Sequence, residues 1–148
     1  MRQKIIAAVL AAGLTSAAAA FPALAQDAPK PGLVFQLNNA QTIENSCQLT
    51  FVVQNATGVR IEKSAYNMAI VDSDGTVAML ITFEFKPFPE GQPKAQQFSL
   101  PGTTCENISA ISINEFVSCA GGDGAKLTAC EDGIVQSSRT AIEFPWVL

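Results

Sequence analysis

The chain has 148 residues, a formal net charge of −4 and no histidine. The acidic balance argues against binding to nucleic acid, because a phosphate backbone would be repelled. The missing histidine excludes Ser-His-Asp and Cys-His nucleophile systems, imidazole metal sites and the usual general base at neutral pH. We therefore predict a protein that is not an enzyme and that holds no cofactor and no metal.

The N-terminal segment has the three parts of a cleavable secretory signal peptide. Arg2 and Lys4 form its basic start, residues 5–20 are apolar or small, and Ala23-Leu24-Ala25 fits the small-x-small cleavage pattern. Removing residues 1–25 leaves roughly 120 residues, the size of one domain. We expect a periplasmic or secreted protein without a transmembrane anchor after cleavage, because no later apolar run is long enough to cross a bilayer.

Strand-like alternation dominates the rest of the chain. Residues 26–32 contain two prolines and predict a flexible leader, followed by a single folded domain at residues 33–148. Within the domain, apolar and polar residues alternate with a period of two, which is typical of strands that bury one face. In chain order we expect strands at residues 33–38, 47–54, 61–71, 77–85, 95–100 and 110–117, and an edge strand at 141–148 that Pro145 interrupts. The third strand has apolar residues on both faces, as a bulged or deeply packed central strand would.

Turn residues separate these strands. Asn55-Ala56-Thr57-Gly58 follows the second strand, Ser73-Asp74-Gly75 joins two strands as a short hairpin, and the proline-rich residues 87–91 end a strand. About seven short strands without a convincing helix predict an all-β fold, an antiparallel immunoglobulin-like β-sandwich. The glycine-rich residues 120–125 are expected to be the most flexible segment.

All four cysteines, Cys47, Cys105, Cys119 and Cys130, follow the signal peptide. In an oxidising compartment they are most simply two disulfides, for which three pairings exist. We favour Cys119–Cys130, which closes the glycine-rich loop, together with Cys47–Cys105, which would link two core strands. A zinc or redox site is the alternative, although closely spaced cysteine pairs and a Cys-x-x-Cys motif are both missing.

A few polar residues have competing interpretations. Asp72 and Asp74 could act as paired carboxylates or supply part of a calcium site, but a hairpin turn needs the same residue types. Lys63-Ser64 could form a dyad only if their side chains met, and adjacent strand residues point to opposite faces. Asn55 and Asn107 begin sequences of the glycosylation type.

The C-terminus, Phe144-Pro145-Trp146-Val147-Leu148, is wholly apolar. Phe144 and Trp146 either pack onto the sandwich or form an exposed anchor for a protein partner, since tryptophan is favoured at binding hot spots.

Several landmarks occur together in the chain: the four cysteines, Asn55-x-Thr57-Gly58, Val71-Asp72-x-Asp74-Gly75, Pro89-x-Gly91 and Ile113-Asn114-x-Phe116. This set resembles small exported, periplasmic proteins of alphaproteobacteria, and its turns are similar to those of bacterial immunoglobulin-like domains of the FxLyD type. The resemblance covers approximately residues 33–130. Because its motifs are turns and cysteines, it implies a β-sandwich fold and no catalytic residue.

Taken together, these features favour a non-catalytic exported β-sandwich that binds another envelope protein or serves as an accessory module. Edge-strand addition is the recognition mode that such a fold offers most readily. The alternative is a small-ligand or carbohydrate-binding module, which normally displays a face of exposed aromatic residues. One tryptophan and one tyrosine give that alternative little support.

Overall fold

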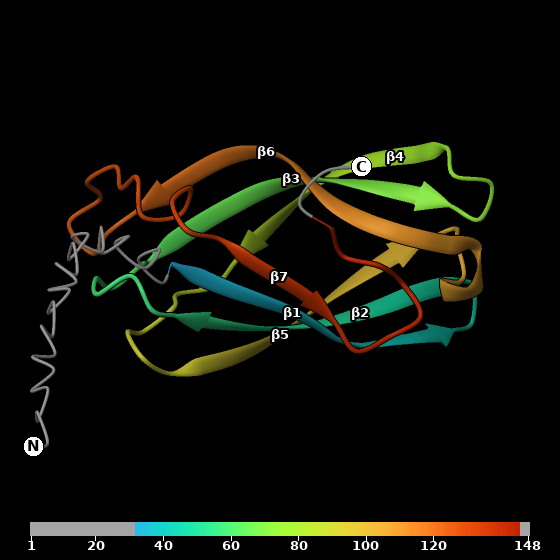
Figure 1. Cartoon of the computed structure of the whole chain (residues 1–148), viewed down its shortest axis with the longest axis horizontal. Helices are drawn as coiled ribbons and strands as arrows, with labels where there is room; N and C mark the ends of the chain where they lie inside the picture. The colour runs from blue at the N-terminus through green and yellow to red at the C-terminus, as the bar shows by residue number, and fades with distance from the viewer. Residues whose placement is uncertain (1–31, 146–148) are drawn as a thin grey trace, which may run out of the picture.

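The computed structural model describes residues 32–145, which form a β-sandwich of seven strands in two stacked sheets (Figure 1). The strands are β1 (Leu33–Ile43), β2 (Ser46–Asn55), β3 (Lys63–Asp72), β4 (Val77–Phe85), β5 (Pro93–Pro101), β6 (Ile108–Ala120) and β7 (Val135–Ser138). A short 3-10 helix, η1 (Cys105–Asn107), precedes β6. The predicted all-β sandwich is confirmed, while the predicted signal peptide, residues 1–25, lies outside the described residues.

One sheet has the strand order β5-β2-β1-β7 and the other has the order β4-β3-β6. All neighbouring strands are antiparallel except β1 and β7, which run parallel. The rings of Phe83 on β4 and Phe98 on β5 stack with centroids 4.3 Å apart, so these two edge strands lie on the same side of the sandwich. As predicted, β3 is a deeply packed central strand with bulges in its pairing.

The last strand differs from the prediction. The sequence predicts an edge strand at residues 141–148, but the seventh strand of the described residues is β7, and Glu143 forms only an isolated parallel bridge with Ala110. The reason lies between them, where the Ser138 hydroxyl donates to the Ile142 carbonyl at 2.6 Å and bends the chain. Pro145 then lacks the amide hydrogen that a continued ladder would need. Residues 146–148 lie outside the described residues.

The boundary of the leader also differs. The sequence predicts a flexible leader through residue 32, but Gly32 is buried and belongs to the folded domain. Its amide donates to the Gly133 carbonyl at 3.2 Å, and its carbonyl accepts from the Ala56 amide at 3.0 Å. A side chain at this position would collide with the backbone oxygens of Asp132 and Gly133. Close backbone packing therefore requires glycine here.

The core consists of the inward residues of both sheets, as the alternation predicts. Phe35 on β1 lies edge-to-face against Tyr66 on β3, with ring centroids 5.2 Å apart, and joins the two sheets. The largest fully buried side chains are Tyr66, Phe35, Phe51, Phe88, Leu33, Leu37, Leu49, Ile61, Met68, Ile70, Leu100 and Ile111. Burial of this apolar surface is the main term that stabilises the fold.

The single tyrosine also ties the core to the segment before β7. The Tyr66 hydroxyl donates to the Cys130 carbonyl at 3.0 Å. Burial raises the pKa of Tyr66 well above its usual value, and the nearby Glu131 carboxylate raises it further. The hydroxyl therefore stays protonated and keeps this hydrogen bond at any physiological pH.

Two disulfides form, and the favoured pairing is confirmed. Cys47–Cys105 joins β2 to η1 across 58 residues of sequence, and Cys119–Cys130 joins the end of β6 to the segment before β7 across 11 residues. By chain entropy alone, these bridges are worth roughly 4 and roughly 3 kcal/mol. Both crosslinks reinforce a core that is already well packed.

Candidate functional site

The carboxylates of the β3–β4 hairpin serve the turn. Asp72 Oδ1 accepts from the Asp74 amide at 3.0 Å and from the Thr76 amide at 2.9 Å. Gly75 has a φ of 81°, the left-handed conformation that favours glycine. Within residues 32–145, no group of three or more His, Cys, Asp or Glu could hold a metal ion. The geometry of Asp72 is thus explained by the hairpin alone.

Two further sequence candidates, Ser64 and Asn55, lie in the interior of the domain. Ser64 is buried, and its hydroxyl has no hydrogen-bond partner among the described residues, whereas Lys63 is exposed on the opposite face. Asn55 is fully buried, and its Nδ2 donates to the carbonyls of Val59 at 2.7 Å and Phe88 at 2.9 Å. Both amide hydrogens of Asn55 are therefore engaged in holding loops together.

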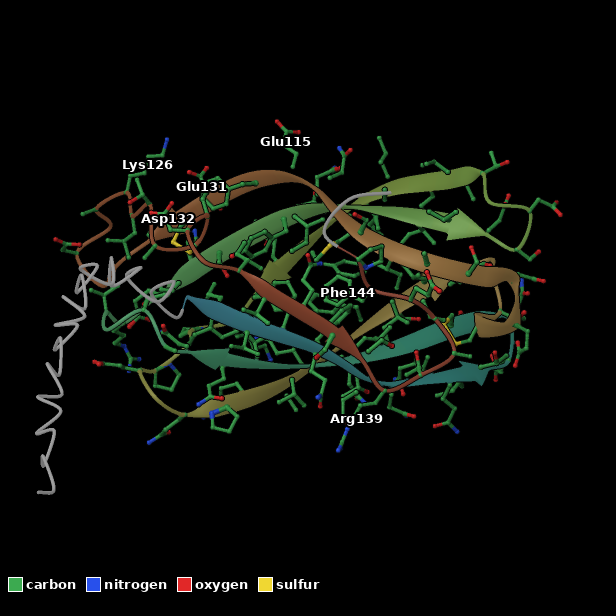
Figure 2. The ribbon with its side chains drawn as sticks, viewed as in Figure 1. Glu115, Lys126, Glu131, Asp132, Arg139 and Phe144 are labelled. Atoms are coloured by element: carbon green, nitrogen blue, oxygen red, sulfur yellow. A yellow bond between two sulfur atoms is a disulfide. The ribbon has the colours of Figure 1, made fainter. Side chains whose placement is uncertain are left out.

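Of the two C-terminal candidates, Phe144 lies in the interior of the described domain and Trp146 lies outside the described residues. Phe144 is only 5% exposed and its ring lies 5.4 Å from that of Phe51, so it packs between the sheets (Figure 2). The interpretation of Phe144 as an exposed anchor is therefore wrong, because the bend after β7 turns its ring inward. Trp146 lies outside the described residues, and its role in partner binding stays a prediction.

The sheet edges are the remaining places for recognition, because an edge strand presents unpaired backbone donors and acceptors. Two of the four edges are guarded, and a third, that of β6, is covered only at its two ends. Strand β5 begins and ends with proline and carries Lys94, and β7 has only four residues. On β6, the Ile111 amide donates to the Glu143 carbonyl at 2.9 Å near the start of the strand, and the Cys119 carbonyl accepts from the Leu127 amide at 3.0 Å near its end.

Strand β4 is the unguarded edge. It has nine residues and no proline, and Leu80 and Val77 are 58% and 47% exposed. Ala69 of β3 lies opposite Leu80 in the ladder and is only 1% exposed, so the exposed apolar surface at this position belongs to β4 itself. A long, apolar and uncovered edge is a template for pairing with another chain. The sequence contains one indication of this edge, because Leu80 is an apolar residue at an outward position of the strand, between Ala78 and Thr82.

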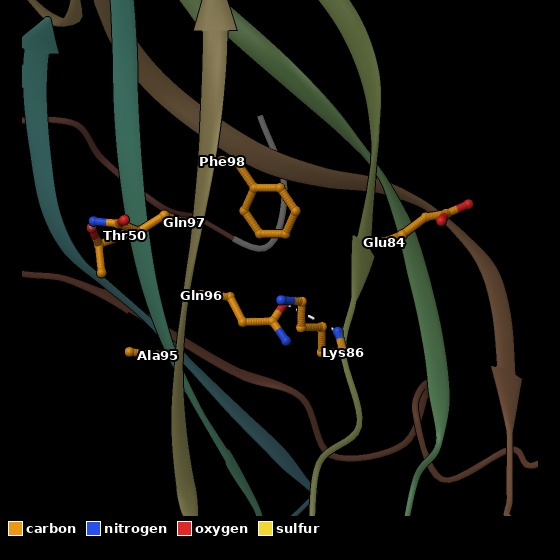
Figure 3. A pocket seen from close by; sticks show the side chains of 7 residues that line it. All are labelled: Thr50, Glu84, Lys86, Ala95, Gln96, Gln97 and Phe98. Carbon is orange, nitrogen blue, oxygen red and sulfur yellow. Dashed lines mark hydrogen bonds between the residues drawn. The ribbon is translucent and has the colours of Figure 1, made fainter.

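A groove of about 500 Å³ lies between the C-terminal end of β4 and β5 (Figure 3). Its lining is mixed, with Glu84 and Lys86 from the β4 side and Gln96 and Phe98 from β5. Gln96 Oε1 accepts from the Lys86 amide at 3.1 Å and so satisfies the first backbone donor beyond β4. The groove thus marks where the open edge ends.

The chain matches no protein-family model and no curated protein. Among solved structures, it is similar to that of IrmA from Escherichia coli, with 12% sequence identity and a TM-score of 0.48. The match covers 79% of this chain and 97% of that one. A likeness this distant assigns neither a family nor a function. Within residues 32–145, no helix is long and apolar enough to cross a membrane.

Proposed function

We propose that this protein is a non-catalytic protein-binding module of the bacterial envelope, which takes an extended segment of its partner along β4. The supporting observation is the contrast among the sheet edges: β4 is apolar and uncovered along its length, while β5 is bounded by prolines, β7 is short and β6 is covered at both ends. Strand addition supplies main-chain hydrogen bonds, and alternate side chains of the partner supply specificity.

The proposed location is the periplasm or the surrounding medium. Two disulfides support a compartment that is oxidising, where such bonds form and persist. This location also agrees with the signal-like N-terminal sequence and with the resemblance to exported alphaproteobacterial proteins that have an FxLyD-type domain.

Protein binding is favoured over the carbohydrate-binding alternative. A sugar-binding face is normally paved with exposed aromatic rings, yet Tyr66 is fully buried and most phenylalanines of the described residues lie in the core. The exposed apolar surface on β4 is aliphatic, with Leu80 and Val77 at its centre. Aliphatic side chains beside an open backbone edge suit a peptide strand better than a sugar.

Site-specific crosslinking tests the proposal. A photo-crosslinking amino acid at Leu80, introduced in the full-length chain expressed in its native envelope, is expected to capture a protein partner. Val117 on β6 is the matched control, because it is 50% exposed and Leu80 is 58% exposed. Adducts at position 80 and not at 117 support the proposal, whereas no adduct at 80, or equal adducts at both positions, contradicts it.

A further inference from the structure

We infer that the C-terminal segment Trp146-Val147-Leu148 folds back over the outer face of the β4-β3-β6 sheet, where the Trp146 indole covers Ala69 and Ser112. Two observations support this docking: small side chains on that face are buried, and the described residues end beside them. The inference is independent of the proposed function, because it concerns a contact within one chain.

Small side chains on the outer face of this sheet are shielded from water. The Tyr66 ring of β3 lies against Phe35 of the other sheet, so Ala69, three positions further along β3, points to the outer side. Ala69 is 1% exposed, and Ser112, its ladder partner on β6, is 2% exposed. An alanine and a serine side by side are too small to shield each other, so a further group must lie over this pair.

The strands do not supply that group. All seven strands of the described residues belong to the two sheets, and the second sheet packs on the inner side of β3. On β4, Leu80 is the ladder partner of Ala69 and is 58% exposed, so the cover does not extend over the β4 edge. Val71 and Ala110, the next outward pair of β3 and β6, are buried as well. The covering group therefore lies over β3 and β6.

The described chain ends at this part of β6 (Figure 1). The Glu143 amide donates to the Ser109 carbonyl at 2.9 Å, and the Ile111 amide donates to the Glu143 carbonyl at 2.9 Å, which forms a parallel bridge. One further step of this pairing places Pro145 beside Ser112. The segment that follows Pro145 thus starts next to the buried pair.

The three residues beyond Pro145 are directed to the outer face and are long enough to cover the pair. Proline has no amide hydrogen for the next ladder bond, and Phe144 fills the inner side by packing against Phe51. Three extended residues span about 10 Å, and neighbouring strands lie about 4.8 Å apart. The segment can therefore cross β6 and reach β3, with Trp146 nearest to Ser112.

A competing place for the indole lies further along β6, in a pocket of about 220 Å³. Its apolar lining residues are Tyr66, Ile113, Phe116 and Ile134. To reach this pocket, the chain would have to keep following the β6 edge, which Pro145 opposes. An indole in the pocket would also leave the burial of Ala69 and Ser112 unexplained.

Thiol labelling of the mature, disulfide-bonded protein tests the contact. Ser112→Cys is nearly isosteric, and its thiol is expected to react with iodoacetamide at least tenfold more slowly than that of Ser99→Cys, the same substitution at an exposed position of β5. Adding Trp146→Ala to Ser112→Cys is expected to speed its labelling at least tenfold, whereas the same addition leaves the labelling of Ser99→Cys unchanged. Circular dichroism verifies that each variant is folded.

The fluorescence of Trp146, the only tryptophan, gives an independent measurement. Its emission is expected to be blue-shifted, and its quenching by acrylamide severalfold weaker, in the folded protein than in the chain unfolded by urea. Ser112→Lys is expected to remove most of both differences by displacing the indole, while Ser99→Lys retains them.

Labelling of Ser112→Cys as rapid as that of Ser99→Cys, or slow labelling that Trp146→Ala leaves unaltered, overturns the inference. So does an indole that acrylamide quenches equally in the folded and unfolded chains. An indole that stays protected in Ser112→Lys lies elsewhere, as in the pocket beside Ile113, and likewise contradicts docking over Ala69.

Discussion

Strands β4 and β5 are both edge strands on the same side of the sandwich, yet they differ in how their unpaired backbone groups are protected from pairing with another chain. Strand β5 has proline at both ends and mostly polar side chains toward solvent, whereas β4 has no proline and exposes Leu80 and Val77. The two strands meet through the stacked rings of Phe83 and Phe98. The difference teaches that one edge is protected against pairing while its neighbour, in the same surroundings, is left available.

The largest expected effect comes from breaking the contact that joins the two edges. Phe83 on β4 is 2% exposed, so Phe83→Ala should lower the free energy of unfolding by about 4 kcal/mol through lost burial and a cavity. Its partner Phe98 on β5 is only partly buried, and Phe98→Ala should cost about 2 kcal/mol. Urea unfolding measures both values. Equal losses of unfolding free energy in the two variants would contradict the expectation that Phe83 is packed more deeply than Phe98.

The second largest effect is expected in the loop that connects β4 to β5. Asn55 holds it by donating to the Phe88 carbonyl, and it also fixes the turn after β2 through Val59 and Thr57. Asn55→Ala should cost about 3 kcal/mol, because buried hydrogen-bond partners would be left unsatisfied. Asn107→Ala, at an exposed asparagine in the second glycosylation-type sequence, should change stability by less than about 0.5 kcal/mol. Similar losses in the two variants would contradict the buried network.

A smaller loss of stability is expected at Gln96, in the groove between β4 and β5. Gln96 on β5 accepts from the Lys86 amide, so Gln96→Ala should lower the free energy of unfolding by about 1 kcal/mol. Gln97→Ala is the matched control, because its hydrogen bond to Thr50 Oγ1 has a similar length, 3.2 Å, and is similarly exposed, but lies within one sheet. Chemical denaturation of both variants distinguishes them. A larger loss for Gln97→Ala would argue against a bond that bridges the edges.

The smallest effect is expected at Glu106 on η1, where it shows what one exposed surface charge contributes to stability. The pKa of Glu106 is lowered by a hydrogen bond from its own backbone amide and by one from Thr42 Oγ1, at 2.8 Å. A carboxylate with a lowered pKa adds stability above its unfolded-state pKa, and that stability is lost as the pH falls through the folded-state value. Melting curves of the wild type and Glu106→Gln should therefore differ slightly at neutral pH and converge in acid. A difference that grows in acid would contradict this sign.

Most of the fold could be predicted because each core strand buries one face. Runs such as Leu33-Val34-Phe35 and Cys47–Val53 carry their own alternation, and the first six strands were visible from it. The second half of β1 was not, since a bulge between Leu37 and Asn39 shifts its register and its residues are largely polar. The disulfide pairing followed from the expected facing of Cys47 and from the loop between Cys119 and Cys130.

Strand β7 and the open edge could not be predicted with the same success. Val135-Gln136-Ser137-Ser138 has a single apolar residue, and its strand conformation depends on parallel pairing with β1, about a hundred positions earlier in the sequence. Alternation along one strand also does not reveal which neighbours it has. Leu80 gave a local signal, but its meaning required the sheet order that leaves β4 at the edge.

The hydrogen bond from Tyr66 to the Cys130 carbonyl has a practical consequence for following the molecule in solution. Since the chain contains one tyrosine, all phenolate absorbance in an alkaline titration comes from this side chain. The raised pKa means that ionisation should be delayed until the segment around Cys130 detaches and admits water. Ultraviolet absorbance thus provides a label-free optical reporter of local opening near the second disulfide.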